Sequence, residues 1–368
     1  MPSYYTASKS VGKTVRTVIF RIFLVFFTTV FIIVAGLLGA VLIVEFGPSV
    51  KARDLFVVSV METSAAKFLA TSFLGQDKVD EILKANSMQT VDEITDTDLV
   101  IIGKPHNKPN TGENSANITQ KPAIPGSNGQ EIDPDGDGID IVDVSGSTFN
   151  GKMMIVYDPT RVFIGTSGNY GEDTSGRTIV EIYNSYDNVV AGINGGGWDD
   201  HDGHGTGGIP LGIVISQGEV LWGLSDTSYE CCGITDEGKL IVGTFTVQQA
   251  QNMEITNAVG FGPTLIVNNV PTEALGSGGG LNPRTAIGQR ADGAMLLLTI
   301  DGRTTNSLGA SLRDVQDIML KFEAINAYNL DGGSSTSMLF HGEHINVNAS
   351  VWGLRRMCTA FLVRENDD

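Results

Sequence analysis

The sequence predicts a mixed α+β protein, in which a strand-rich main domain with a few helices follows one transmembrane helix and a short helical stalk. Three observations predict this class. A long uncharged apolar run lies near the N-terminus, and from residue 151 onward short apolar runs alternate with glycine-rich turns. The composition, with 41% hydrophobic and 18% charged residues among 368, provides enough apolar side chains for a buried core.

The formal net charge is −18, from 24 basic and 42 acidic residues. A protein that binds nucleic acid without regard to sequence needs an excess of lysine and arginine to neutralise phosphates. The acidic composition therefore excludes sequence-independent binding of nucleic acid. Three cysteines in so long a chain also exclude a scaffold held by disulfides. Because a bridge between neighbours requires a strained ring, we expect Cys231 and Cys232 to be two buried thiols.

Residues 1–21 form a basic tail, and residues 22–44 form an uncharged run longer than the roughly 20 residues that a helix needs to cross a bilayer. The tail carries four lysine and arginine residues and no acidic one. The positive-inside rule therefore places the N-terminus in the cytoplasm and the main domain outside, in a single-pass protein of the cell membrane. A cleaved signal peptide is the alternative, although its apolar part is usually shorter and no clean cleavage site follows.

The segment between the membrane and the main domain is expected to have three parts. Residues 45–102 are predicted to form a helical juxtamembrane stalk. Residues 103–130, rich in proline, asparagine, glycine and serine, are predicted to be a flexible linker. Residues 131–150 form an acidic lead-in with one strand, and the main domain then occupies residues 151–368.

Two acidic patterns suggest metal ligands. Asp133, Asp135 and Asp137 occupy alternate positions, and Gly136 and Gly138 would permit the sharp turns of a calcium loop. A helix–loop–helix calcium site needs a glutamate at its twelfth position, which is Val144 here. A divalent cation such as calcium and a plain acidic turn therefore stay as alternatives, and the sequence requires no other cofactor. The run His201–His204 is a second, weaker metal pattern.

Within the main domain, apolar runs predict strands and two amphipathic segments predict helices. One helix is expected over Thr174–Tyr186. Another begins at Ser311, which resembles the first residue of a capping box because Asp314 follows three positions later. The predicted strands cover residues 153–157, 161–166, 212–216, 239–245, 264–268 and 295–300.

The strongest chemical signal is the sequence NLDGGSSTSM at residues 329–338. An apolar strand ends at Asp331, two glycines follow, and hydroxyl side chains come next. A carboxylate at such a strand end can project into a cleft and perform acid/base chemistry, while open backbone N–H groups can hold an anion. The alternative is an aspartate that only caps the turn.

Three further segments place polar residues at the ends of predicted strands. The sequence NGGGW at residues 194–198 offers a tryptophan beside a glycine floor, which suits stacking on a sugar or a tight turn with a packed ring. The sequence NPRTAIG at residues 282–288 carries Arg284, whose guanidinium suits a phosphate or a structural ion pair. The sequence DGR at residues 301–303 joins a carboxylate to a guanidinium, which could bind substrate or pair with each other.

In their order along the chain, the four segments resemble those of the phosphodiester glycosidase family, and the resemblance covers about residues 151–363. The resemblance implies a hydrolase that cleaves a sugar-1-phosphodiester and leaves a free sugar and a phosphomonoester. This agrees with the residues themselves, because cleaving the acetal requires a carboxylate near the anomeric carbon and a group that stabilises the departing phosphate.

The resemblance also implies roles for individual residues. Asp331 is expected to be the acid/base or the nucleophile, and Asp301 the second carboxylate. The residues expected to hold the phosphate and the sugar are Asn194, Gly195, Trp198, Arg284, Thr285, Arg303, Gly332, Gly333 and Ser335.

The expected substrate is a glycosyl-phosphate glycan of the cell envelope or an exopolysaccharide, since membrane-anchored bacterial members of the family are associated with such polymers. Two alternatives stay open. One is a glycoside hydrolase that acts on non-phosphorylated glycans, and the other is a non-catalytic surface protein that binds glycans. Release of sugar from a phosphodiester, compared with a phosphate-free glycoside, distinguishes the three.

Overall fold

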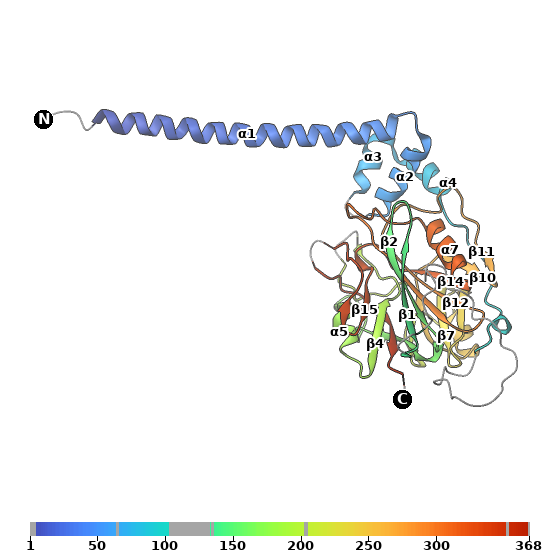
Figure 1. Ribbon diagram of the computed structural model, residues 1–368. Coiled ribbons are helices and arrows are strands. Elements are labelled where there is room, and N and C mark those ends of the chain that lie inside the picture. Colours follow the sequence, from blue (N-terminus) through green and yellow to red (C-terminus); the bar gives the residue numbers. More distant parts are fainter. Residues whose placement is uncertain are drawn as a thin grey trace.

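The computed structural model describes residues 5–63, 66–102, 133, 136–201, 205–350 and 353–366, with side chains from residue 15 onward. One long helix, α1 (Tyr5–Phe46), extends away from a body that is built mainly of strands (Figure 1). Short helices lie where α1 meets the body (Figure 1). This architecture confirms the predicted α+β class, with one apolar helix and short helices ahead of a strand-rich body.

Helix α1 is apolar and exposed over the length that a membrane requires. Its segment Val15–Phe46 is long and apolar enough to cross a bilayer, and none of its most apolar window is buried against the body. Thr28 donates its hydroxyl proton to the Leu24 carbonyl at 2.7 Å, so this polar side chain is satisfied within the helix. A helix of this kind fits a membrane span or a signal sequence.

The helices that follow form a small cap with its own core. They are α2 (Val50–Met61), α3 (Lys67–Leu74) and α4 (Gln76–Ala85). The side chain of Ser49 caps α2 by accepting from the Ala52 N–H at 3.3 Å. Buried apolar side chains of the three helices pack together: Val57, Val58, Ala70, Val79 and Ile82.

The chain after α4 lies along the body as far as it is described. Met88 pairs with Ala274, the Thr95 hydroxyl accepts from the Val242 N–H at 2.9 Å, and the Ile101 N–H donates to Ala291 at 2.9 Å. A short 3-10 turn, η1 (Thr97–Leu99), interrupts this run. Residues 88–101 are therefore packed against the main domain, and the linker predicted at 103–130 lies outside the described residues.

Three antiparallel sheets make up the body. The large sheet has the order β1-β2-β13-β12-β14-β10-β11, the second sheet β16-β15-β4-β17-β3, and the third sheet β6-β5-β9-β7-β8. The strands of the large sheet are β1 (Ile139–Ser145), β2 (Asn150–Val156), β10 (Thr264–Val267), β11 (Val270–Pro271), β12 (Arg284–Arg290), β13 (Met295–Ile300) and β14 (Ala324–Leu330). Those of the second are β3 (Val162–Thr166), β4 (Val189–Asn194), β15 (Met338–Phe340), β16 (Glu343–His344) and β17 (Thr359–Arg364). Those of the third are β5 (Val214–Ser216), β6 (Glu219–Trp222), β7 (Tyr229–Thr235), β8 (Leu240–Phe245) and β9 (Ile255–Gly260).

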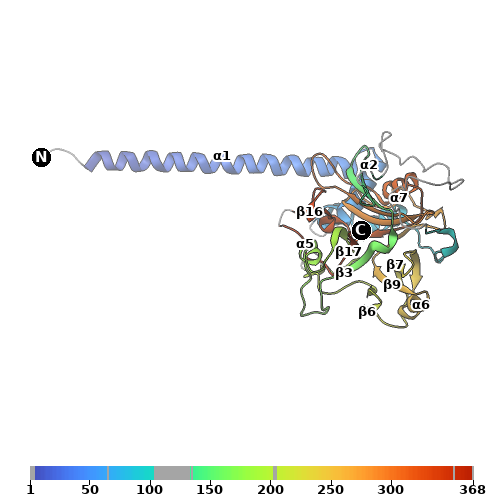
Figure 2. The same ribbon diagram turned by 60° about the horizontal axis from the view of Figure 1, so that its bottom comes forward.

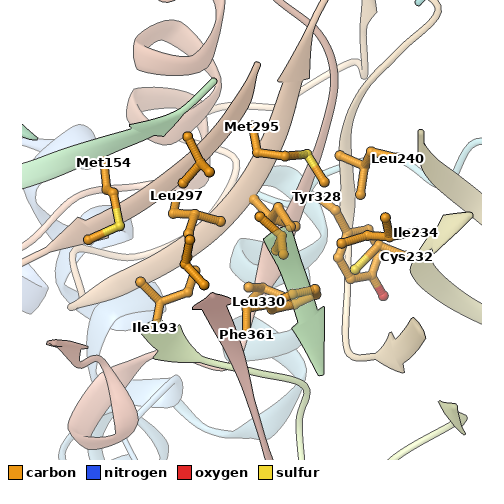
Figure 3. Close-up of a cluster of buried hydrophobic side chains, with 14 of the residues drawn as sticks. Met154, Ile193, Cys232, Ile234, Leu240, Met295, Leu297, Tyr328, Leu330 and Phe361 are labelled. Atoms are coloured by element: carbon orange, nitrogen blue, oxygen red, sulfur yellow. The ribbon is translucent and has the colours of Figure 1, made fainter. Parts of the chain in front are cut away.

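One apolar core joins all three sheets. Side chains from the large sheet, such as Leu297 and Tyr328, meet Ile193 and Phe361 of the second sheet and Cys232 of the third (Figure 3). All five are essentially inaccessible to solvent. Burying this much apolar surface between sheets is the main favourable contribution to the fold.

Three short helices cover the outer faces and begin where their capping residues lie. They are α5 (Ile179–Tyr183), α6 (Val247–Asn252) and α7 (Leu312–Lys321). Ser311 and Asp314 form the expected capping box of α7, which packs on the large sheet. Helix α5 is shorter than the predicted Thr174–Tyr186, because the capping box of Thr178 starts the helix at the next residue. Figure 2 shows α6 with the third sheet, apart from α5.

The cysteines are free thiols, as predicted. Cys231 and Cys232 are both fully buried and face opposite sides of β7, so that they belong to different apolar clusters. Successive side chains of a strand point to opposite faces, and this alternation keeps the two sulfur atoms apart.

The strand register brings the predicted motifs to one edge of the body. Arg284 begins β12 opposite Ile300 at the end of β13, and Thr285 lies opposite Leu330 at the end of β14. In the second sheet, Asn194 at the end of β4 pairs with Ala360 at the start of β17. Antiparallel neighbours thus place the end of one strand beside the start of the next, and the loops after them meet.

We expect Leu297→Ala to lower the free energy of unfolding by about 2–5 kcal/mol, because the side chain lies in the core that all three sheets share. Chemical denaturation of the detergent-solubilised chain measures this. The matched control is Leu224→Ala, whose side chain is 68% exposed and should change stability by less than about 0.5 kcal/mol. Equal losses in the two variants would contradict the assignment of this core.

Candidate active site

The loops at this edge enclose a cavity of about 380 Å³. The large sheet contributes Arg284, Arg303 and Asp331 with the residues that follow it, and the second sheet contributes Trp198 and Arg355 through its loops. The cavity is also lined by Glu62, Asp200, Phe261, Gly262, Pro263, Asn282, Leu312, Asn329, Gly332, Gly333, Ser334 and Ser335. Segments that are far apart in the sequence therefore form one site.

Asp331 is fixed at the junction of the large and second sheets. Its N–H donates to the Gly195 carbonyl at 3.2 Å, and its carbonyl accepts from the Asn194 side-chain amide at 2.6 Å. Burial raises the pKa of the Asp331 carboxyl to about 6, although hydrogen bonds from Ser335 and the Gly332 N–H favour the charged form. Such a group exchanges a proton readily near neutral pH, as a general acid or base must.

Asn194 positions Asp331 and does not line the cavity. Its side-chain oxygen accepts from the Thr285 hydroxyl at 2.7 Å and from the Ser337 N–H at 3.0 Å. Its amide nitrogen donates to Asp331, so every polar atom of this fully buried side chain has a partner. Gly195 is also structural, because a Cβ there would lie 2.9 Å from the Thr359 carbonyl oxygen.

Two predicted arginines lie together on the side of the large sheet. The Arg284 guanidinium donates through Nε to Ala310 at 3.1 Å and through Nη2 to Gly280 at 2.7 Å. Arg303 donates through Nη2 to the Asn282 side chain at 2.9 Å. Burial lowers the pKa of Arg303, and the neighbouring Arg284 lowers it further.

Helix α2 brings a carboxylate to these arginines that the sequence did not reveal. Glu62, the first residue after α2, accepts from Arg284 Nη2 at 2.6 Å, from the Asn282 amide at 2.8 Å and from the Gly280 N–H at 2.8 Å. Its neighbour Thr63 accepts from Arg303 at 3.2 Å. The helical cap that contains α2 therefore forms one wall of the cavity.

The glycines after Asp331 use their N–H groups within the loop. The Gly332 N–H hydrogen-bonds the Asp331 carboxylate, and the Gly333 N–H donates to the Pro283 carbonyl at 2.9 Å. Gly333 has a φ of +60°, a left-handed conformation that favours glycine. These amides shape the loop around Asp331, and the guanidinium of Arg303 lies against Gly333.

A second charged group lies on the side of the second sheet. The Arg355 guanidinium stacks over the Trp198 ring at 4.8 Å from the ring centre and forms an ion pair with Asp200. The sequence motifs indicated Trp198 but not Arg355. The motifs were recognised as polar residues next to a glycine at the end of a predicted strand, and Arg355 has neither feature. Only its position just before β17 could have pointed to this edge.

Asp301, the predicted second carboxylate, is not among the residues that line the cavity. Its carboxylate accepts from the Val347 N–H at 2.9 Å, and its carbonyl accepts from the Ser307 hydroxyl at 2.6 Å. Burial raises the pKa of the Asp301 carboxyl. The carboxylates that do line the cavity are Glu62, Asp200 and Asp331.

The predicted metal ligands are only partly within the described residues. The Asp133 carboxylate accepts from the Gly138 N–H at 3.1 Å and that of Asp137 from the Ile139 N–H at 2.7 Å, so both act as turn caps. Asp135 and residues 202–204 lie outside the described part. Within that part, no group of three histidine, cysteine or acidic side chains is arranged to hold a metal ion.

Comparison with known proteins confirms the family resemblance. Residues 187–364 match the phosphodiester glycosidase family. The chain is 31% identical over 199 residues to the SPbeta prophage-derived uncharacterized protein YomE of Bacillus subtilis, covering 51% of this chain and 29% of that protein. It is 37% identical over 93 residues to the N-acetylglucosamine-1-phosphodiester alpha-N-acetylglucosaminidase of Bos taurus, covering 23% of this chain and 17% of that protein.

A solved structure shares the fold. The catalytic domain of the zebrafish N-acetylglucosamine-1-phosphodiester alpha-N-acetylglucosaminidase, auto-inhibited by its pro-peptide, superposes with a TM-score of 0.51 at 22% identity. The match covers 62% of this chain and 82% of that one. The chain spans less than a third of the length of the two curated relatives above.

We expect Asp331→Asn to stabilise the fold at pH 8. Burial raises the pKa of Asp331 from 3.8 to about 6, so ionisation above pH 6 costs folding free energy that is absent below pH 4. Two pKa units correspond to about 3 kcal/mol, and partial exposure reduces the expected gain to about 1–3 kcal/mol. Denaturation at pH 4 and pH 8 measures it. A gain of equal size at both pH values would show that the buried charge is not its cause.

Proposed function

We propose that this relative of the phosphodiester glycosidases is a membrane-anchored hydrolase of sugar-1-phosphodiester linkages. Its products would be a free sugar and a phosphomonoester. The observation that carries the proposal is the position of Asp331, a partly buried carboxylate with a pKa of about 6, in the same cavity as three arginines. A carboxylate for the anomeric carbon and cations for the phosphate are the two requirements of this reaction.

Asp331 acts in its ionised form in the proposed reaction. The bond from the anomeric carbon to the phosphate oxygen breaks, and the phosphomonoester departs with the bonding electrons. Because a phosphate is a good leaving group, it needs no proton from an acid. Water supplies the new oxygen at the anomeric carbon, either activated by Asp331 as a base or after Asp331 has formed a glycosyl ester. Hydrogen bonds from Ser335 and Gly332 hold the carboxylate for attack.

Arg303 is the better candidate for the phosphate ligand. Three of the described contacts of Arg284 already engage its Nε and Nη2 atoms with two carbonyls and Glu62. The described contacts of Arg303 engage Nη2 alone, with two neutral oxygens. A guanidinium has five N–H donors in a planar fork, so Arg303 keeps donors for a phosphate, and Arg284 supports it as a nearby charge.

The proposed setting is the outer face of the cell membrane. Helix α1 would span the bilayer with the basic N-terminus in the cytoplasm, and the body would face cell-envelope or exopolysaccharide glycans. A glycoside hydrolase on non-phosphorylated glycans is less favoured, because the cavity presents three guanidinium groups that a neutral glycan does not require.

The first test is turnover of a sugar-1-phosphodiester by the detergent-solubilised chain and by Asp331→Asn. We expect the wild type to release sugar with an activity that rises across pH 6, since the ionised carboxylate acts, and the variant to lose at least about 10³-fold in kcat. Asp301→Asn is the matched control, because that carboxylate lies outside the cavity, and it should stay within about three-fold of wild type.

Two outcomes would reject the proposal. Equal losses in the two aspartate variants would show that Asp331 has no special role. Equal wild-type turnover of a phosphate-free glycoside would favour an ordinary glycoside hydrolase, and binding of glycans without any release would favour a glycan-binding protein.

We expect Glu62→Gln to lower KM for the phosphodiester about three- to ten-fold. The Glu62 carboxylate lies 2.6 Å from Arg284 inside the cavity, where it repels an entering phosphate and competes for the same cation. Steady-state kinetics at low ionic strength measures the effect, and high salt should reduce it. A rise in KM would instead assign Glu62 to holding Arg284 in a binding position.

A further inference from the structure

The cavity has a second cationic side that one phosphodiester does not explain. Arg355 lines the cavity from the loop before β17, with its guanidinium over Trp198 and paired with Asp200. Its side chain is 25% exposed, so it is open to the cavity and not sealed in the core. A guanidinium bound to one carboxylate and one ring face still has N–H donors for a further acceptor.

Asp331 lines the same cavity as this side and the phosphate side, and the Arg303 guanidinium lies against Gly333, two residues after Asp331. Apart from burial, the charged groups that shift the pKa of Asp331 are Asp200 and Arg355, whereas those that shift the pKa of Arg303 are Arg284 and Glu62. The two groups also come from different sheets, because Arg284 begins β12 and Arg303 follows β13 of the large sheet, whereas Trp198 follows β4 of the second sheet. A sugar positioned at Asp331 would thus lie in a cavity that presents guanidinium groups from both sheets.

This arrangement matches a sugar that carries two anions. With the anomeric phosphate at Arg303, the ring would lie near Asp331 and Trp198, and the far side of the ring would face Arg355. The buried Trp198 ring supports the Arg355 guanidinium from below, and a guanidinium suits a phosphate or carboxylate. A neutral sugar would leave those donors of Arg355 that Asp200 does not engage with no acceptor other than water.

We propose that the substrate sugar bears a second anionic group, most simply a second phosphate ester, and that Arg355 is the residue that selects it. The proposal rests on the function proposed above and narrows its substrate class to sugars with a phosphate on both sides, such as an internal unit of a polymer of sugar phosphates. Arg355 is then a specificity residue supported by Trp198, and the reaction at Asp331 is unchanged.

The experiment compares matched substrates. They are the methyl phosphodiesters of α-glucose 1-phosphate and of α-N-acetylglucosamine 1-phosphate, each with and without a phosphate at C6, and the glucuronate analogue with a carboxylate at C6. We expect the 6-phosphorylated form of the preferred sugar to have a kcat/KM at least ten-fold above that of its neutral form, mainly through KM. A similar gain for the glucuronate would show that Arg355 selects any anion at this position.

Arg355→Gln should bring that ratio to about one. Arg356→Gln is the matched control, because Arg356 donates to the Gly176 carbonyl at 2.8 Å and does not line the cavity, and it should keep the wild-type ratio. Circular dichroism and thermal melting would show that both variants fold.

The inference and the function fail in different ways. A wild type that cleaves the neutral phosphodiesters with no preference for the 6-phosphorylated ones overturns the inference and leaves the function standing. An unchanged ratio in Arg355→Gln, or an equal loss on both substrates, also overturns it, the second by assigning Arg355 to the anomeric phosphate. A wild type that cleaves none of the phosphodiesters overturns the function and the inference together.

Discussion

The site depends on one buried side chain, the amide of Asn194, which connects the large sheet to the second sheet. Its nitrogen holds the carbonyl of Asp331, and its oxygen holds Thr285 of the large sheet and Ser337 next to β15. A buried amide with an unpaired atom costs about 1–3 kcal/mol, so all three contacts must form together. These contacts hold the end of β14 against Asn194 of the second sheet. Asp331, the next residue, is thereby fixed at the junction of the two sheets.

Charge in the cavity is balanced locally although the chain carries −18 overall. Three guanidinium groups and three carboxylates line it, and two arginines are paired with a carboxylate, Arg284 with Glu62 and Arg355 with Asp200. Pairing lowers the cost of burying each arginine, and it leaves Arg303 as the cation with neutral described partners. An acidic protein can in this way attract an anion at one point, because fields within a few ångströms act with little screening from solvent.

The sequence predicted those features that depend on local pattern. The α+β class, the apolar helix and the four motifs could be recognised because apolar runs, glycines and strand ends follow short-range rules, and Asp331, Arg284, Arg303 and Trp198 do meet in one cavity. It also predicted Asp301 as a second carboxylate of the site, since a glycine follows it as one follows Asp331, and only the packing of the folded chain separates the carboxylate that lines the cavity from the one that does not. Glu62 and Arg355 were missed because no pattern surrounds them, and their place depends on how remote segments dock.

Glu62 lies close in the chain to α1, and its place in the cavity therefore limits how far the site can be from this helix. Only Gly47–Ser49 and the 12 residues of α2 separate the end of α1 from this wall of the cavity, and 12 helical residues extend about 18 Å. With α1 in a bilayer, such a short connection would keep this wall of the cavity close to the lipid headgroups. Glycans attached at the membrane surface would then meet the opening by lateral diffusion, whereas the distal parts of a long polymer would have to fold back to reach it.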